Sequence, residues 1–180
     1  IAADSDMAQT LVAVYREASP RPAVVGSNYF NTHKHRDFIR CGAGRPADHV
    51  ERKTVITSGS LLDLRLAQEL GGFREDYFID SVDHEFCLRA RSRGHRIVIG
   101  CKPAMRHAIG GATCYPHWLA GLTAFNHSPV RKYYISRNCL VTIKHYLARE
   151  PAWCLRQVLR LMIEFASILL IEDHKRKKLA

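Results

Sequence analysis

Three carboxylates fall within six positions of the chain, at Asp80, Asp83 and Glu85. Carboxylates this close together can do general acid and base work, because each can take or give a proton at a reacting hydroxyl. The structural alternative places Asp83 and Glu85 in the first turn of a helix, where the positive end of the helix dipole favours negative charge. In that interpretation Glu85 pairs with Arg89 one turn later. This stretch alone leaves both interpretations open.

The elements around the carboxylates predict where they lie. A helix is expected from Val82 to a stop at Gly94, followed by a buried, β-branched strand at Ile97–Ile99. Upstream, residues 54–63 predict a strand, a break of small residues, and then a second strand or turn. Small residues after a strand, here Gly59 and Ser60, let a ligand approach the backbone closely, although a bulge or tight turn explains them equally well.

The other elements follow from apolar periodicity and from glycine and proline positions. Asp4-Ser5-Asp6 has the D-x-D form that binds a divalent ion and a diphosphate, but we interpret it as ordinary helix capping. The expected elements are a helix over residues 1–18, a buried strand over 23–27, a polar loop over 28–52 that includes a possible hairpin, a short helix over 64–70 ended by two glycines, a loop over 113–130, a long helix from 131 to about 149, and a last helix from 151.

The composition restricts the class of protein. The chain has 180 residues, 47% of them hydrophobic, which is enough to bury a core and predicts one domain. Its formal net charge of +10 favours nucleic acid, anionic lipid or a phosphorylated ligand. The basic residues are scattered and no nucleic-acid motif is present, so we expect no nucleic-acid partner. A basic nucleic-acid-binding module and a non-catalytic, membrane-associated scaffold remain the alternatives to an enzyme.

The cysteines and the termini bear on location. The six cysteines are spread without a CxxC pattern, which argues against structural zinc and favours a reducing compartment. Cys87, Cys139 and Cys154 fall in apolar helical patterns and are expected to pack as small hydrophobes. No signal peptide or membrane-spanning apolar run is visible. The chain begins with Ile1 rather than Met, so we expect a piece of something longer.

The last helix has a broad apolar face and is followed by the basic run 175–178. This combination is typical of a helix that lies on an anionic membrane surface. A helix buried in a homo-oligomer, or against a missing part of the protein, would have the same pattern. We therefore expect two parts: residues 1–150 as the main domain, and residues 151–180 as an amphipathic segment that contacts membrane or protein.

Two further side chains are candidates for binding. His107 ends a strand-like segment just before Gly110-Gly111, which keeps a ligand role open, although a lone histidine is usually structural. Arg137 lies on a helical turn next to Tyr134 and Asn138. A cation beside an aromatic ring suits a diphosphate or sugar, and it equally suits an arginine packed on an aromatic neighbour.

Taken together, these stretches resemble the C-terminal catalytic half of the family 2 inverting glycosyltransferases, which have the GT-A fold. The resemblance is closest to bacterial rhamnosyltransferases that build O-antigen, cell-wall linker or rhamnolipid. It implies an α/β fold: the C-terminal part of a Rossmann-like mixed sheet flanked by helices, plus the amphipathic C-terminal segment. The segments that carry it lie within residues 1–150 and are 57–62, 71–73, 78–89, His107 with 110–111, and 131–138.

The resemblance also implies roles for the carboxylates. In the family, an acidic residue six positions before an arginine is the general base, and counting back from Arg89 gives Asp83. Inversion requires one carboxylate that takes the proton of the acceptor hydroxyl as this attacks the anomeric carbon. Glu85 is expected to orient the acceptor or to hold Arg89, and Asp80 is the second candidate for the base.

Other roles implied by the resemblance concern the donor. Gly59 and Ser60 match the segment that lines the donor and acceptor cleft, and Arg137 is a candidate contact to the diphosphate or the acceptor. His107 matches a histidine that is often a ligand to the metal, Mg2+ or Mn2+. The D-x-D metal motif of the family would fall just before Ile1, so the donor half is expected to be missing and this chain alone is not expected to transfer sugar.

For the intact enzyme, the resemblance implies dTDP-L-rhamnose as the nucleotide-sugar donor. The acceptor would be a lipid-linked glycan, a glycolipid or a hydroxylated lipid. The implied location is the cytoplasm, peripheral on the inner face of the bacterial plasma membrane, which suits the basic and apolar C-terminus.

Overall fold

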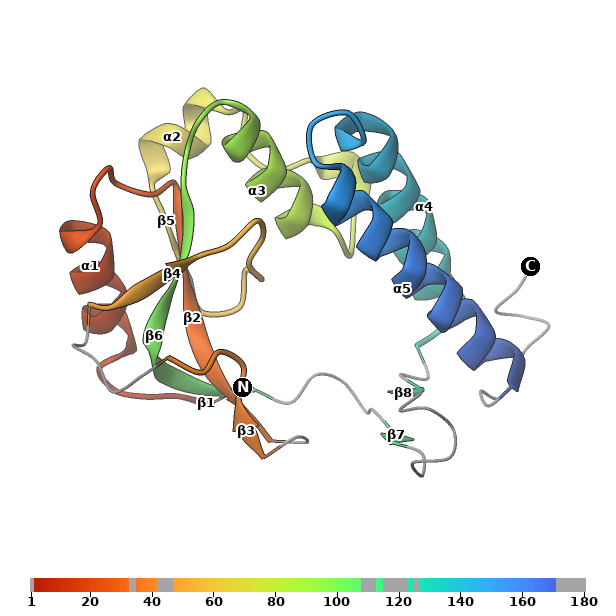
Figure 1. Ribbon diagram of the computed structural model, residues 1–180, viewed down its shortest axis with the longest axis horizontal. Coiled ribbons are helices and arrows are strands. Elements are labelled where there is room, and N and C mark those ends of the chain that lie inside the picture. Colours follow the sequence, from red (N-terminus) through yellow and green to blue (C-terminus); the bar gives the residue numbers. More distant parts are fainter. Residues whose placement is uncertain are drawn as a thin grey trace. The chain divides into compact units, whose positions relative to one another are not determined.

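The computed structural model describes residues 2–32, 35–41, 47–107, 113–114, 123–124 and 127–170. Its chain forms two compact units (Figure 1). The first unit comprises Ile1–Arg74 and Val82–Ala108, and the second comprises Glu75–Ser81 and Ile109–Ala180. The expected functional division at residue 150 stays a prediction.

The first unit is a mixed sheet flanked by helices, as the α/β prediction required. Its two central strands, β2 and β6, run parallel from the Val24–Ile97 pair to the Asn31–His107 pair (Figure 1). Strands β3 and β5 pair antiparallel with β2, and β1 and β4 pair antiparallel with β6. The elements of this unit are β1 Ala2–Ala3, α1 Met7–Glu17, β2 Val24–Asn31, β3 Arg36–Asp37, β4 His49–Glu51, β5 Ser60–Leu62, α2 Leu64–Glu69, α3 Val82–Ser92 and β6 Ile97–His107.

Side chains of the central strands alternate between two cores, as the pleat of a sheet requires. On one face, Val25 and Val98 pack with Leu11 and Val14 of α1. Residues of β2 and β6 that point to the other face pack against α2 and α3, in a core that includes Val24, Ile97, Ile99, Ala67, Leu70, Phe86, Cys87 and Ala90. The helix that carries the acidic residues is thus fixed against the sheet by its apolar side.

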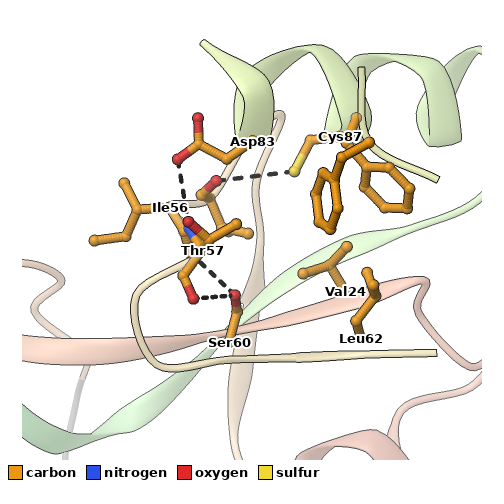
Figure 2. Close-up of a pocket in the computed structure, with 10 residues that line it drawn as sticks. Val24, Ile56, Thr57, Ser60, Leu62, Asp83 and Cys87 are labelled. Atoms are coloured by element: carbon orange, nitrogen blue, oxygen red, sulfur yellow. Dashed lines mark hydrogen bonds between the residues drawn. The ribbon is translucent and has the colours of Figure 1, made fainter. Parts of the chain in front are cut away.

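The strand predicted at residues 54–56 is absent; these residues form a loop, and the strand β5 begins only at Ser60 (Figure 2). The sequence pattern was nevertheless informative, because the Val55 side chain is buried in the core. This segment pairs with neither central strand, because β5 occupies β2 at residues 24–26 and β4 occupies β6 at residues 98–100. Both central strands are also longer than predicted, and the expected hairpin is the pairing of β2 with β3.

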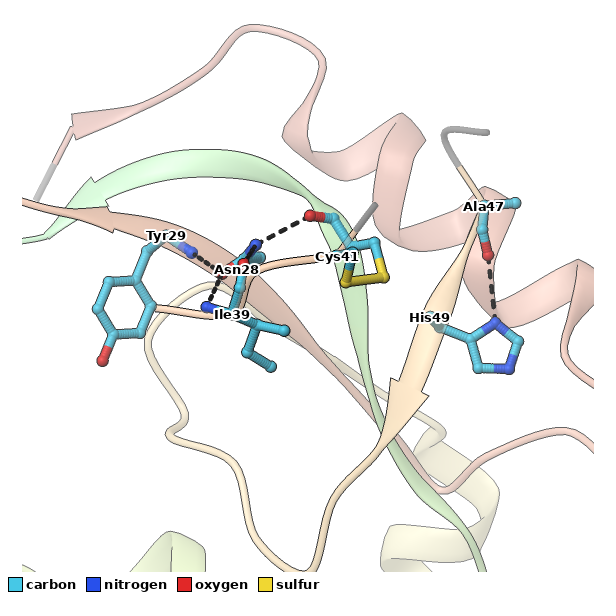
Figure 3. Close-up of a disulfide and its surroundings, with 7 residues drawn as sticks. Asn28, Tyr29, Ile39, Cys41, Ala47 and His49 are labelled. Carbon is cyan, nitrogen blue, oxygen red and sulfur yellow. Dashed lines mark hydrogen bonds between the residues drawn. A yellow bond between two sulfur atoms is a disulfide. The ribbon is translucent and has the colours of Figure 1, made fainter. Parts of the chain in front are cut away.

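A bulge interrupts the pairing of β2 with β6, and the side chain of Asn28 compensates for it (Figure 3). Its Oδ1 accepts hydrogen bonds from the amides of Tyr29 and Ile39, and its Nδ2 donates to the carbonyls of Ile39 and Cys101. Buried backbone groups that the ladder leaves unpaired are satisfied in this way. The residue is therefore structural, in a segment that the sequence predicted to be a loop.

The expectation of reduced thiols is wrong for one pair, because Cys41 and Cys101 form a disulfide (Figure 3). The spacing of the cysteines does not predict this bond, because the two residues are 60 positions apart in the sequence. They come together because the loop after β3 lies beside β6. Cys87, Cys139 and Cys154 are free and buried, as predicted. Of Cys114 the structure describes only the backbone.

The second unit is mainly a pair of packed helices, and its elements are the 3-10 turn Glu75–Tyr77, β7 Thr113–Cys114, β8 Thr123–Ala124, α4 Pro129–Tyr146 and α5 Pro151–Leu170. Helix α4 is capped by Ser128, whose Oγ accepts from the amide of Arg131, and proline is its first residue. A buried ion pair joins the helices, with Lys132 Nζ 2.7 Å from Glu164 Oε1.

Much of the apolar face predicted for α5 is exposed within the described residues. Trp153, Cys154 and Ile168 are buried. Leu155, Leu159, Met162, Ile163, Phe165 and Leu170 are each more than half exposed. In the described part of the chain, no helix has the length and apolar character needed to cross a bilayer. The basic run 175–178 lies outside the described residues.

Candidate functional site

Asp83 is the second residue of α3, and its carboxylate lies beside the loop before β5 (Figure 2). The amide of Thr57 donates to Oδ2 over 3.4 Å, and the amide of His84 donates to Oδ1 over 2.8 Å. The side chain retains 21% of its exposure, so it is neither in the packed interior nor fully in water. The carboxylate lies in the first turn of α3, at the positive end of the helix dipole.

The loop that faces Asp83 is held in one shape. Ser60 Oγ donates to the carbonyls of Ile56 and Thr57, at 3.2 and 2.9 Å. Gly59 has a φ of +64°, and a Cβ built on it would lie 2.7 Å from Met105 Sδ. The left-handed backbone angle favours glycine, and any other side chain here would require Met105 to shift. The close approach that the sequence predicted at Gly59 is therefore made by the protein's own side chain, and the tight turn is real.

A pocket of about 200 Å3 opens beside Asp83, between α3 and the strands β2 and β5 (Figure 2). Thr57, Ser60 and Asp83 are its polar residues. Its remaining lining is apolar side chains and one thiol: Val24, Val55, Ile56, Leu62, Phe73, Phe86 and Cys87. Burial raises the pKa of the Cys87 thiol to about 12, so this sulfur is neutral and is not a nucleophile.

Glu85 and Arg89 form a structural pair rather than part of this pocket. Arg89 Nη2 lies 3.0 Å from Glu85 Oε2, and Glu85 is only 4% exposed. The same guanidinium donates to the carbonyls of Leu70 and Gly72, at 2.8 and 2.6 Å. The pair thus ties α3 to the end of α2. Of the two roles expected for Glu85, this geometry favours holding Arg89.

Asp80, the second candidate for the base, lies in the second unit and has a different partner. Arg131 donates from Nε to Oδ2 at 2.9 Å and from Nη2 to Oδ1 at 3.3 Å. A guanidinium that engages both oxygens of a carboxylate stabilises its charge and occupies its lone pairs. Both oxygens of Asp80 are therefore engaged by a cation, whereas the oxygens of Asp83 accept from backbone amides.

Asn138 holds the backbone before the acidic helix. It is completely buried, and its Nδ2 donates to the carbonyls of Tyr77, Ile79 and Asp80 at 2.7, 2.8 and 3.1 Å. Within this segment Phe78, Asp80 and Ser81 have positive φ angles of 55°, 62° and 63°. Such angles cost energy in residues other than glycine and persist only where the surroundings impose them. Asn138 supplies three of the contacts that do so.

Arg137, expected to contact a diphosphate or the acceptor, binds its own chain. Its Nη1 donates to the carbonyl of Asp76 at 3.0 Å and to Asn138 Oδ1 at 2.8 Å. Sequence reasoning named Arg137 but missed the supporting roles of Arg131 and Asn138. The available signal was an asparagine inside a long helix, where it is a poor helix former and needs another reason to be present.

His107 is the last residue of β6, and its ring lies edge-on to Tyr29 at 5.4 Å between centroids. Its Nδ1 is buried and has no hydrogen-bond partner among the described residues. Burial lowers its pKa, which favours the neutral imidazole that binds metal ions. His107 fits one ligand position, but in the described part of the chain no three His, Cys, Asp or Glu side chains gather into a metal site. These residues do not make a complete site for Mg2+ or Mn2+.

Comparisons with known proteins agree with part of the resemblance. No protein-family model matches the chain, and no solved structure matches it. A segment of 90 residues, half of the chain, is 35% identical to dTDP-rhamnosyl transferase RfbF of Shigella flexneri. The match spans 29% of the length of that relative. The chain is therefore similar to part of a rhamnosyltransferase.

Proposed function

We propose that this chain is the acceptor-side half of a family 2 inverting glycosyltransferase with the GT-A fold, and that Asp83 is its general base. One observation carries the proposal: a partly exposed carboxylate lies at a pocket, beside a loop that the fold holds rigidly. The mixed sheet with flanking helices is compatible with such a domain. The similarity to a dTDP-rhamnosyl transferase supports the rhamnosyl group as the unit transferred.

In the proposed reaction, Asp83 removes the proton of an acceptor hydroxyl as the oxygen attacks the anomeric carbon of the donor. The new carbon–oxygen bond forms on one face while the bond to the nucleotide diphosphate breaks on the other, and the diphosphate leaves with the electron pair. The configuration at the anomeric carbon is inverted. The Thr57 amide, 3.4 Å from Oδ2, orients the carboxylate without neutralising it.

A divalent cation, when bound, would supply positive charge to the leaving diphosphate. We propose Mg2+ or Mn2+ for the intact enzyme, with His107 as one ligand because its buried Nδ1 has no partner among the described residues. The other ligands would come from outside the described residues. Glu85 and Arg89 keep α3, and with it Asp83, fixed on α2.

The proposed donor is dTDP-L-rhamnose, and the proposed acceptor is a lipid-linked glycan or glycolipid of bacterial cell-surface polysaccharide synthesis. An acceptor of this kind lies at a membrane, and we place the enzyme at the inner face of the plasma membrane. Support comes from α5, whose exposed apolar side chains, including Leu159 and Met162, suit an interfacial helix. A homo-oligomer that buries the same face is the alternative.

The test uses the protein expressed from its complete reading frame, with dTDP-L-rhamnose as donor. Asp83→Asn should lower the rate of transfer by about 100-fold or more, because general base catalysis typically contributes 10²–10⁴-fold. Binding of the donor should change little, since Asp83 acts on the acceptor. Asp80→Asn is the matched control and should retain more activity. Near-normal turnover by Asp83→Asn would remove Asp83 from the base role.

A further inference from the structure

The pocket beside Asp83 differs chemically from a site for a nucleotide diphosphate. Among the described residues its lining includes no lysine or arginine, and Asp83 is the only charged residue there. A negatively charged diphosphate inside this pocket would meet a carboxylate and no cation. The donor's phosphates are therefore excluded from it on electrostatic grounds.

Several polar groups of the lining are already engaged by the protein. Ser60 Oγ donates to two loop carbonyls, the Thr57 amide points at Asp83, and Cys87 Sγ lies 3.9 Å from the carbonyl of Val55. A sugar hydroxyl placed deep in the pocket would lose its hydrogen bonds to water and find few replacements. An apolar group has no hydrogen bonds with water to lose, and its own surface would pack against Val24, Leu62 and Phe86.

The size of the pocket limits what it can hold. About 200 Å3 corresponds to roughly seven water volumes at about 30 Å3 each. This space accepts a methyl group with its ring carbon, an alkyl segment or one saccharide ring, so the chemistry of the lining and not its size selects among them. Because Asp83 lines the pocket, a group inside it lies next to the hydroxyl that Asp83 meets.

We propose that this pocket takes an apolar substituent of the acceptor, next to the hydroxyl that is glycosylated. The proposal rests on the base role of Asp83 and adds a substrate class: an acceptor with a methyl or alkyl group close to its reacting hydroxyl. A 6-deoxy sugar and a hydroxyacyl chain share this chemistry. The acceptor is thus selected by an apolar neighbour of the hydroxyl and not by a further polar contact.

The experiment uses the protein from its complete reading frame, dTDP-L-rhamnose, and two matched acceptor pairs. One pair, methyl L-rhamnoside and methyl L-mannoside, differs by a single hydroxyl; the other, 3-hydroxydecanoate and 3-hydroxybutyrate, differs in chain length. In at least one pair, the more apolar acceptor should have a kcat/KM about 10- to 100-fold higher, the range expected for discrimination by an apolar pocket. The pair that discriminates identifies which source supplies the group.

Variants connect the preference to the pocket. Ile56→Asn, and the milder Ile56→Thr if the first fails to fold, should reduce the preference to less than about 3-fold, because a polar group then lines the pocket mouth. Leu64→Asn is the control, since Leu64 is 68% exposed and does not line this pocket. It should leave the preference unchanged.

Three results would overturn the inference: no preference within either pair, a preference that survives Ile56→Asn, or an Ile56→Asn effect on the affinity ratio of dTDP-L-rhamnose to dTDP. The last would assign the pocket to the donor's methyl group. Donor hydrolysis without transfer to any of the four acceptors would refute this inference and leave the proposed function standing. Absence of both hydrolysis and transfer would refute the proposed function, and this inference with it.

Discussion

Replacing Asn138 with alanine should destabilise the second unit strongly, although the change removes only one small side chain. Asn138 is fully buried in α4, and its Nδ2 serves the carbonyls of Tyr77, Ile79 and Asp80. Alanine is the better helix former, so helix propensity alone predicts a small gain in stability. The two arguments predict opposite signs, which makes the substitution informative.

The magnitude follows from the burial of the groups that lose a partner. Tyr77 is also fully buried, so water cannot replace the lost donor at its carbonyl. The carbonyl of Tyr77 keeps the amide of Ile79 as a partner, so each of the three lost hydrogen bonds is counted at the net value of about 1 kcal/mol. The sum is about 3 kcal/mol in the free energy of unfolding.

Urea unfolding followed by the fluorescence of Trp153, which is buried in α5, reports on this unit. Hydrogen exchange of the amides at 77–81 should accelerate about 100-fold, the factor that about 3 kcal/mol corresponds to. Arg137→Ala is the graded control. It removes an exposed bond to the Asp76 carbonyl and a partly buried bond to Asn138 Oδ1, and it should cost about 1 kcal/mol, less than Asn138→Ala. An Asn138→Ala protein within 1 kcal/mol of wild type, with unchanged exchange, would refute the reasoning.

Two further predictions concern pH and membranes. Burial and the nearby charges of Arg131 and Lys132 lower the pKa of His127 below its ordinary 6.5. The folded state therefore binds fewer protons than the unfolded state, so the free energy of unfolding should fall as the pH drops below about 6.5. His127→Gln should make the free energy of unfolding, measured from about pH 7.5 to about pH 5.5, depend less on pH. His145→Gln is the control. The chain should sediment with vesicles that contain phosphatidylglycerol, and Leu159→Glu with Met162→Glu should weaken this at least about 10-fold, because charge replaces the apolar face. Leu140→Glu, at an exposed position of α4, should leave vesicle binding unchanged. If the chain with Leu159→Glu and Met162→Glu binds vesicles as well as the unmodified chain, an oligomer contact for α5 is favoured instead.

The helices could be predicted well because their ends carry local signals. Helix α2 ends at Glu69 before Gly71 and Gly72, both at positive φ, and α3 begins at Val82 with acids in its first turn. These signals act within a few residues, so the helix ends that they specify do not depend on contacts with distant parts of the chain. The placement of Asp83 against a small-residue loop also followed from sequence, but only through the resemblance to a family.

What sequence could not supply depends on contacts between distant segments. Residues 54–56 had the pattern of a buried strand, but β5 and β4 occupy the neighbouring positions on β2 and β6. The disulfide joins Cys41 to Cys101, which are 60 residues apart. The hydrogen bonds of Asn138 join residues that are 58 to 61 positions apart. No local pattern encodes such pairings. The exposure of the apolar face of α5 could not be predicted either, because the sequence pattern is the same whether or not a partner covers that face.

The three carboxylates of the acidic stretch show why one of them is distinguished. Asp83 and Glu85 are two residues apart on a helix, about 200° around its axis, so they must face different surroundings. Glu85 is buried against Arg89, and both oxygens of Asp80 are held by Arg131. Asp83 instead has two backbone amides as partners, one at 3.4 Å, and no arginine or lysine ion pair among the described residues. Asp80 and Asp83 each accept two of the about four hydrogen bonds that a carboxylate can take, but those to Asp83 come from neutral amides and not from a cation. In its proposed base role Asp83 is distinguished by having no lysine or arginine partner among the described residues, and an arginine introduced next to it should lower the rate of sugar transfer by the intact enzyme.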